Sequence, residues 1–234
     1  MRRSFKDKST IDITSQCYPR FHVHRETYNV DNEEYYGQPL EDTDVEIYVD
    51  ASIQSNQAAG TGLYIRENSR RHTKKIGPHW ISDYCYLGKQ TSVLLCETVA
   101  IYLASDWMIK NPHLINESSV AIYTDCQNAI KSLEQLNKSS EHDAALENKE
   151  PPSYNMVLKA TLVSLKTAAR NCQLTMRWVK AHNGHTGNMM ADVNAKIGAT
   201  AHAERGDPPS PFNIYDIISS KSCHSRARRR GPGA

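Results

Sequence analysis

Three short stretches of β-favouring residues open the part of the chain that has regular hydrophobic patterning. They cover residues 45–50, 60–67 and 83–89, and alternation of apolar and polar positions supports the third. A small polar loop over residues 51–59 joins the first two. Short connections favour antiparallel neighbours, so this region predicts a meander of three strands.

Beyond residue 90 the apolar residues change to the three-then-four spacing of an amphipathic helix. Residues from Val93 to Trp107 follow this spacing, which predicts a helix over residues 92–109 that the pair Asn111-Pro112 ends. The same reasoning predicts further strands over residues 119–125 and 174–180, helices over residues 126–136, 154–171 and 188–201, and a polar, acidic loop over residues 137–153. This order mixes a meander with right-handed crossovers, so we expect an α/β fold with a five-stranded mixed sheet flanked by helices.

The patterned region occupies only part of the 234 residues, a length that suits one full domain with tails or two small domains. Residues 1–43 lack sustained periodicity and predict an N-terminal extension or linker, with one short strand expected around residues 21–24. The globular domain is expected over residues 44–203. Residues 204–234 are Pro-rich and then basic, which predicts a C-terminal tail.

Composition narrows the class of protein without naming a partner. Hydrophobic residues make up 39% and charged residues 23%, which is ordinary for a soluble globular protein. The net charge of +2 neither indicates nor excludes a polyanionic binding partner. The six cysteines include no CxxC pair, so we expect reduced thiols rather than a disulfide framework or a zinc site. The sequence shows neither a membrane-spanning apolar run nor a signal peptide, so we expect an intracellular protein, in the nucleus or cytoplasm, without a membrane partner.

Two apolar runs, residues 47–50 and 122–125, each end on an aspartate, Asp50 and Asp125. Taken alone, either aspartate is better explained as a turn or helix-cap residue. Glu97 lies beside the apolar stripe of its helix, and taken alone it is better explained as a boundary residue that reaches solvent. The combination of the three carboxylates is harder to explain in this way, because open α/β sheets bind ligands outside the carboxyl ends of their strands.

A fourth carboxylate follows a loop that contains two histidines. Residues 178–192 run from a strand through a glycine-containing loop with His182 and His185 to Asp192, in the first turns of a helix. A zinc site is a weak interpretation because no cysteine is near. A histidine beside a carboxylate cluster suits proton transfer near neutral pH. We interpret the four carboxylates as a divalent-metal site for cutting nucleic acid.

The chain resembles the type 1 ribonuclease H domain over about residues 44–203. Residues 50–52, 92–101, 122–130 and 178–192 are similar, in order, to the four motifs of that family. The sequences of residues 92–101 and 211–218 are similar to those of the ribonuclease H domain found in non-LTR retrotransposon polyproteins. Cys96, Cys126 and Met189 depart modestly from the motifs, and no basic helical protrusion is evident, so strong independent substrate binding is not expected.

The resemblance implies a ribonuclease H-like fold and endonucleolytic cleavage of the RNA strand of an RNA–DNA hybrid. It also implies two Mg²⁺ ions about 3.5–4 Å apart, which Mn²⁺ could replace. The metal ligands would be Asp50, Glu97, Asp125 and Asp192, with Asp50 bridging the ions and His182 transferring protons. The candidate substrate contacts, to 2′-hydroxyls and phosphates, are Ser52, Gln90, Asn128 and Lys180. A reverse transcriptase encoded elsewhere is the expected protein partner.

Two alternatives stay open. The first is a catalytically idle ribonuclease H fold kept as a nucleic-acid-binding or tethering module of a retroelement-derived protein. The intact carboxylate set argues against it, because a scaffold gains nothing from packed like charges. The second is another metal nuclease or a transposase of related architecture. The histidine loop before Asp192 favours ribonuclease H over that possibility.

Overall fold

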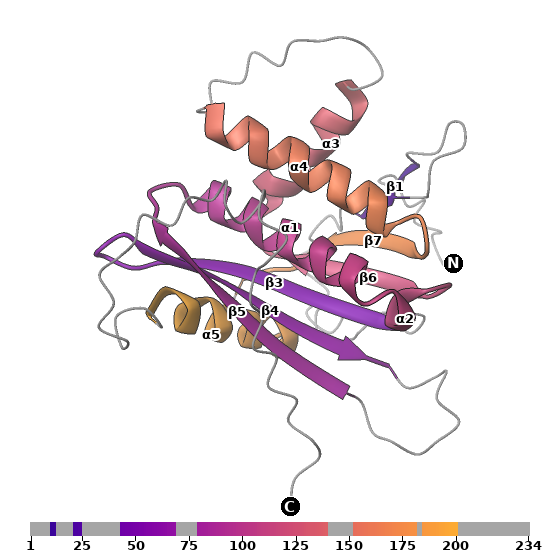
Figure 1. Cartoon of the computed structure of the whole chain (residues 1–234), viewed down its shortest axis with the longest axis horizontal. Coiled ribbons are helices and arrows are strands. Elements are labelled where there is room, and N and C mark those ends of the chain that lie inside the picture. The colour runs from indigo at the N-terminus through magenta and orange to yellow at the C-terminus, as the bar shows by residue number, and fades with distance from the viewer. Residues whose placement is uncertain are drawn as a thin grey trace, which may run out of the picture.

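A single mixed sheet organises the residues described by the computed structural model, which are 10–12, 21–24, 43–68, 79–139, 152–181 and 184–200 (Figure 1). The strand order is β1-β2-β7-β6-β3-β4-β5. The strands are β1 (Thr10–Asp12), β2 (Phe21–His24), β3 (Val45–Ile53), β4 (Ala58–Glu67), β5 (His79–Lys89), β6 (Ser119–Thr124) and β7 (Gln173–Trp178). The helices are α1 (Val93–Lys110), α2 (Pro112–Ile115), α3 (Gln127–Ser139), α4 (Pro152–Ala168) and α5 (Thr186–Thr200).

The expected fold class is confirmed in the five strands from β7 to β5. Strands β3, β4 and β5 form the antiparallel meander, and β6 and β7 run parallel to β3. The sheet also gains two strands from the N-terminal extension. Strand β2, at the position where one short strand is expected, pairs in parallel with β7, and β1 pairs with β2. Strand β1 is too short for hydrophobic periodicity to reveal it.

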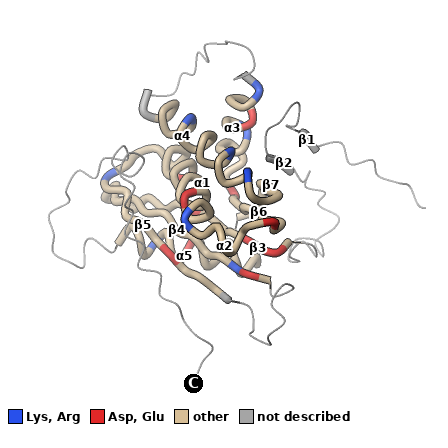
Figure 2. The backbone as a smooth tube through the Cα atoms, turned by 45° about the vertical axis from the view of Figure 1, so that its right-hand side comes forward, with Lys and Arg blue, Asp and Glu red and all other residues tan. Residues whose placement is uncertain are grey.

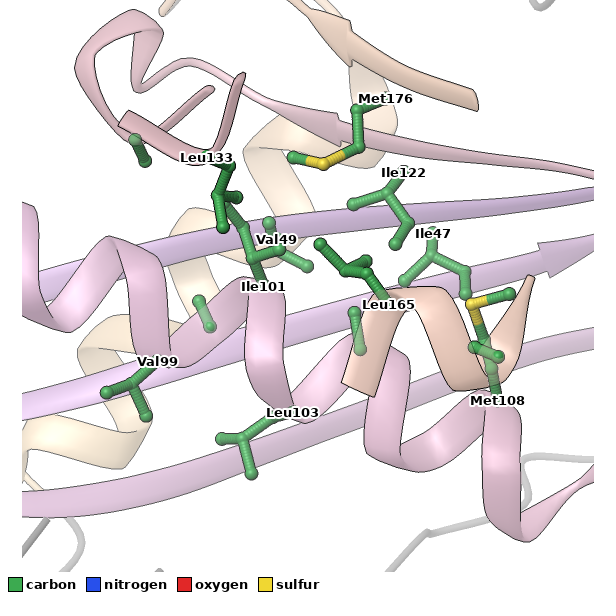
Figure 3. Packing of buried hydrophobic residues seen from close by; sticks show 14 of the residues in the cluster. Ile47, Val49, Val99, Ile101, Leu103, Met108, Ile122, Leu133, Leu165 and Met176 are labelled. Atoms are coloured by element: carbon green, nitrogen blue, oxygen red, sulfur yellow. The ribbon is translucent and has the colours of Figure 1, made fainter. Parts of the chain in front are cut away.

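Helices cover the two faces of the sheet unequally. Helices α1, α3 and α4 lie on one face and α5 lies on the other (Figures 1 and 2). Alternation along β3 explains the division, because Ile47 and Val49 enter the core beneath α1 while Tyr48 belongs to a separate cluster on the opposite face. In Figure 3, Ile47 and Ile122 of the sheet lie close to Leu165 of α4 in this core.

Backbone contact brings α5 against the second strand of the meander. A Cβ atom added at Gly62 would lie 2.1 Å from the carbonyl oxygen of Ala191, and one added at Gly60 would lie 2.2 Å from the amide nitrogen of Ala199. Only glycine allows so close an approach. These two positions therefore fix how α5, with Asp192, sits over the sheet.

Several element boundaries differ from the prediction. The loop expected over residues 51–59 shrinks to residues 54–57, because Gln57 adopts a positive φ of 69° and closes a tight hairpin. Part of the loop expected over residues 137–153 is helical. Helix α3 continues to Ser139 because Asn137 is buried, and α4 begins at Pro152, while residues 140–151 lie outside the described part.

Other expectations hold with small changes. Ser92 caps α1, its Oγ accepting a hydrogen bond from the backbone N–H of Leu95 at 3.2 Å, and α1 ends at Lys110, just before the expected Asn-Pro pair. The short helix α2 follows directly and was not predicted, since one turn gives no periodic signal. The four cysteines within the described ranges form no disulfide bond. No helix in those ranges combines the length and apolar character that a bilayer crossing requires.

Candidate active site

Three of the predicted carboxylates meet at one place. One ligand oxygen from each of Asp50, Glu97 and Asp125 lies within 4.8 Å of the other two. Asp50 comes from β3, Glu97 from the second turn of α1, and Asp125 from the bend between β6 and α3. Because β3 and β6 are parallel neighbours, their two aspartates reach the same edge of the paired region.

The sequence pattern predicts that Asp50 ends its strand, but β3 continues to Ile53. Asp50 instead lies just beyond the point where β3 stops pairing with β6. Strand β3 pairs with β6 only as far as Tyr48, whereas its pairing with β4 continues to Ile53. Beyond Tyr48, β3 therefore continues without pairing to β6. Asp50 lies in this stretch, and its Oδ1 accepts a hydrogen bond from the Ala51 N–H at 2.7 Å.

The three carboxylates are mostly withdrawn from water. Asp50 is 7% exposed and Glu97 is 4% exposed, while Asp125 is half-buried. Burial, followed by the charge of Asp125, raises the pKa of Asp50 to about 7. Burial and the neighbouring Asp50 and Asp125 carboxylates raise the pKa of Glu97 well above its ordinary value. The site therefore resists holding three negative charges by itself.

The donor set fits a hard divalent cation. Oε2 of Glu97 is buried and has no hydrogen-bond partner among the described residues. An unpaired buried carboxylate oxygen is costly, and a cation at this point would answer it together with the oxygens of Asp50 and Asp125. Ligands that are all carboxylate oxygens suit Mg²⁺ or Mn²⁺ better than softer metals.

Asp192 lies beside this cluster rather than within it. It is absent from the three-residue group, but its charge contributes to raising the pKa of Asp50. Its Oδ2 accepts a hydrogen bond from the Lys196 ammonium at 2.6 Å, one turn further along α5. The fourth predicted ligand is thus close to the cluster and paired with a lysine of its own helix.

The remaining predicted site residues, one histidine and four candidate substrate contacts, differ in how far the structure describes and exposes them. His182 lies outside the described residues. Ser52 is half-buried two residues beyond Asp50, and Asn128 is exposed in the first turn of α3. The side-chain amide of Gln90 donates to the Leu87 carbonyl at 2.9 Å, so one of its hydrogen-bonding groups is already used. Lys180 is half-buried just after β7.

Sequence patterns assign no role to the Trp178 side chain. Its indole Nε1–H donates to the backbone carbonyl of Asp125 at 3.0 Å, across 53 residues of chain. No local pattern predicts such a contact. The two cysteines beside the site are weaker candidates as ligands, because burial raises the pKa of Cys96 to about 12 and that of Cys126 to about 11.

Comparison with known proteins agrees with this geometry. The family model for RNase H matches residues 42–200, whereas no curated protein sequence matches the chain. The structure of LC9-RNase H1, a type 1 RNase H with the type 2 active-site motif, matches with a TM-score of 0.55 at 15% identity, covering 79% of this chain and 85% of that one. The foamy viral protease-reverse transcriptase in complex with RNA/DNA hybrid matches with a TM-score of 0.52 at 19% identity, covering 76% of this chain and 22% of that one.

The two structural matches establish the fold, and the family match accounts for the motifs. The family match spans more than half of the chain and includes Asp50, Glu97, Asp125 and Asp192. A buried acidic cluster stands at the position where those motifs converge. The chain therefore belongs to the RNase H family.

Proposed function

We propose that this protein is a metal-dependent endoribonuclease that hydrolyses the RNA strand of RNA–DNA hybrids. The observation that carries the proposal is the convergence of ligand oxygens from the buried Asp50 and Glu97 and the half-buried Asp125 within 4.8 Å of one another, in a chain of the RNase H family. Such a cluster is unfavourable without a cation or protons, so its presence argues for metal-assisted chemistry.

The carboxylates divide between two cation positions. Asp50, Glu97 and Asp125 would hold one Mg²⁺, and Asp50 with Asp192 would hold the second, with Mn²⁺ as a substitute. When bound, the pair of cations supplies activation of the attacking water and stabilisation of the leaving oxygen. Because the pKa of Asp50 is about 7, this side chain must give up a proton to bind metal in weakly acidic solution.

Asp192 and His182 complete the proposed machinery. Asp192 would exchange its contact with the Lys196 ammonium for the second cation, which costs little because that ion pair is partly exposed. His182 would carry protons during water attack and product departure, since imidazole titrates near neutral pH.

The proposed substrate contacts distinguish RNA from DNA. Ser52 and Asn128, close in sequence to Asp50 and Asp125, are candidates for 2′-hydroxyl contacts, as is Gln90, and Lys180 is a candidate for a phosphate. The foamy viral relative was solved in complex with RNA/DNA hybrid, which supports the choice of substrate class.

We also propose a retroelement context for the chain. Residues 92–101 and 211–218 resemble the non-LTR retrotransposon version, and the foamy viral relative carries a reverse transcriptase. A reverse transcriptase encoded elsewhere is therefore the proposed partner, inside the cell.

A cleavage assay tests the proposal directly. The wild-type protein with Mg²⁺ should cut the RNA strand of a labelled hybrid but not duplex DNA. The Asp125→Asn variant, which keeps the size of the side chain, should lose at least about 100-fold in rate, and EDTA should stop the wild type. Hybrid binding without cutting by the wild type would support the idle binding module instead. Cutting of duplex DNA would support another kind of metal nuclease.

A further inference from the structure

Asp125 belongs to neither a strand nor a helix, so the direction of its carboxylate depends on how the bend after β6 is held. Strand β7 lies alongside this bend, with Trp178 paired to Thr124 in the parallel register. The Trp178 indole Nε1–H donates to the Asp125 carbonyl at 3.0 Å. The next residue, Val179, donates its backbone N–H to the Thr124 carbonyl, also at 3.0 Å.

These contacts fix the peptide groups on both sides of the Asp125 Cα atom. The peptide group before it is held through the Thr124 carbonyl. The group after it is held twice, through the Asp125 carbonyl by the Trp178 indole and through the Cys126 N–H, which donates to Thr124 Oγ1 at 3.1 Å. With φ and ψ of Asp125 thereby constrained, the carboxylate keeps only its side-chain rotations.

We propose that Trp178 is a positioning residue whose indole N–H aims the Asp125 carboxylate at Asp50 and Glu97. This inference rests on the proposed function of the cluster as a metal site. Trp178 is half-buried and packs against the main core, so its ring is anchored while its N–H reaches the bend. An aromatic ring without the N–H would fill similar space but leave the Asp125 carbonyl without this donor.

The alternative is that the hydrogen bond only satisfies the N–H of a half-buried indole. The two explanations differ in what Trp178→Phe does to metal binding. Groups that orient a metal ligand typically change metal affinity by about 10- to 100-fold when removed. We expect the Kd for Mg²⁺, measured calorimetrically on the hybrid-free protein, to rise about tenfold in Trp178→Phe, near the lower end of that range. Hybrid cleavage should need correspondingly more Mg²⁺, with kcat at saturating Mg²⁺ within about twofold of wild type.

Trp107→Phe is the matched control, because Trp107 is also half-buried against the core but belongs to α1, more than two turns beyond Glu97. Its Kd for Mg²⁺ should equal that of wild type. A folded Trp178→Phe protein with unchanged Mg²⁺ affinity would overturn the inference, as would a loss of kcat that no Mg²⁺ concentration restores. A wild-type protein that binds no Mg²⁺ would instead contradict the proposed function.

A second measurement avoids the variant altogether. In ¹H–¹⁵N spectra of the wild type, Mg²⁺ should shift the assigned indole signal of Trp178, because its acceptor belongs to a metal-ligand residue, and leave that of Trp107 unmoved. If Trp178→Phe does not fold, this spectrum decides. A Trp178 indole signal that stays in place at saturating Mg²⁺ would refute the positioning role.

Discussion

At the scale of single residues, Asp50 is held where its ionised form is disfavoured. Its carboxyl group is nearly buried beside two other carboxyls, and its pKa of about 7 is far above the ordinary value of about 3.9. Between these two values the folded protein binds a proton that the unfolded chain releases. Metal-free protein should therefore lose stability as the pH rises through this window. Geometry suited to binding a cation thus costs stability when no cation is present.

Asp50→Asn should remove this cost along with the activity. In EDTA at about pH 8, the variant should be more stable than wild type by about 1–3 kcal/mol, because the amide keeps the side-chain size without the charge. The free energy of unfolding, measured with urea, should fall for wild type between about pH 4 and pH 7 and fall less for Asp50→Asn.

Asp106→Asn is a suitable control for that experiment. This aspartate lies on α1 outside the cluster and pairs with Lys110. Its replacement should not stabilise the protein at any pH. Equal pH dependence in wild type and Asp50→Asn would show that the Asp50 carboxyl titrates normally in the folded state.

At the scale of elements, the packing of α5 against β4 determines the position of Asp192, the fourth carboxylate. The helix approaches so closely that its backbone touches Gly60 and Gly62, and small residues such as Ala191, Ala195 and Ala199 line its buried side. Helical periodicity predicts that α5 is a helix, but it does not predict how closely the α5 backbone approaches the sheet. The outer side of this helix exposes Met189, Val193 and Ile197, so apolar character alone does not identify the face that packs on the sheet.

Gly62→Ala should push α5 away from the sheet. The added methyl group would lie 2.1 Å from the Ala191 carbonyl oxygen, so the helix must move, at a cost of about 3 kcal/mol. Hybrid cleavage should fall with it, because Asp192 moves with the helix. Thermal unfolding monitored by circular dichroism and the cleavage assay would measure the two effects.

Gly184→Ala offers a comparison with a different physical origin. Gly184 has a φ of +79° but open space around its Cβ position, so alanine there should cost only about 1 kcal/mol of stability. A Gly62→Ala protein as stable as Gly184→Ala would mean that the helix does not touch the strand as closely as described.

At the scale of the whole molecule, the N-terminal extension completes the sheet. Strand β2 pairs in parallel with β7, and β1 pairs with β2, so residues 21–24 of the extension occupy the outer edge of β7. An unpaired strand edge presents backbone donors and acceptors that invite association with other chains. The extension is therefore expected to protect this edge as well as to precede the family domain.

Deletion of residues 1–43 should expose the outer edge of β7. We expect a loss of about 2 kcal/mol in stability and self-association detectable by light scattering, with hybrid cleavage retained, because β2 contributes none of the four carboxylates. Deletion of residues 1–9, which keeps both strands, is the control and should remain unassociated. A fully stable, monomeric protein without residues 1–43 would contradict this role.

Periodicity and motif order predict the five strands from β3 to β7, four of the helices and the three carboxylates that meet, whereas β1 and α2 are too short to be recognised in this way. Periodicity and caps act over a few residues, so α1 and its Ser92 cap, as well as the apolar runs that carry Asp50 and Asp125, can be recognised locally. Motif order then connects the four acidic residues. Boundaries such as the end of α3 were harder to predict, because the burial of Asn137 by the rest of the fold extends the helix.

How these residues act on one another depends on contacts that exist only in the folded chain. The raised pKa values of Asp50 and Glu97 arise from burial and from charged neighbours 28 to 142 positions away in sequence. The hydrogen bond from Trp178 to the Asp125 carbonyl and the pairing of β2 with β7 likewise join distant segments. A local pattern carries information about the next few residues, whereas burial and electrostatic coupling depend on which distant surfaces the folded chain brings into contact.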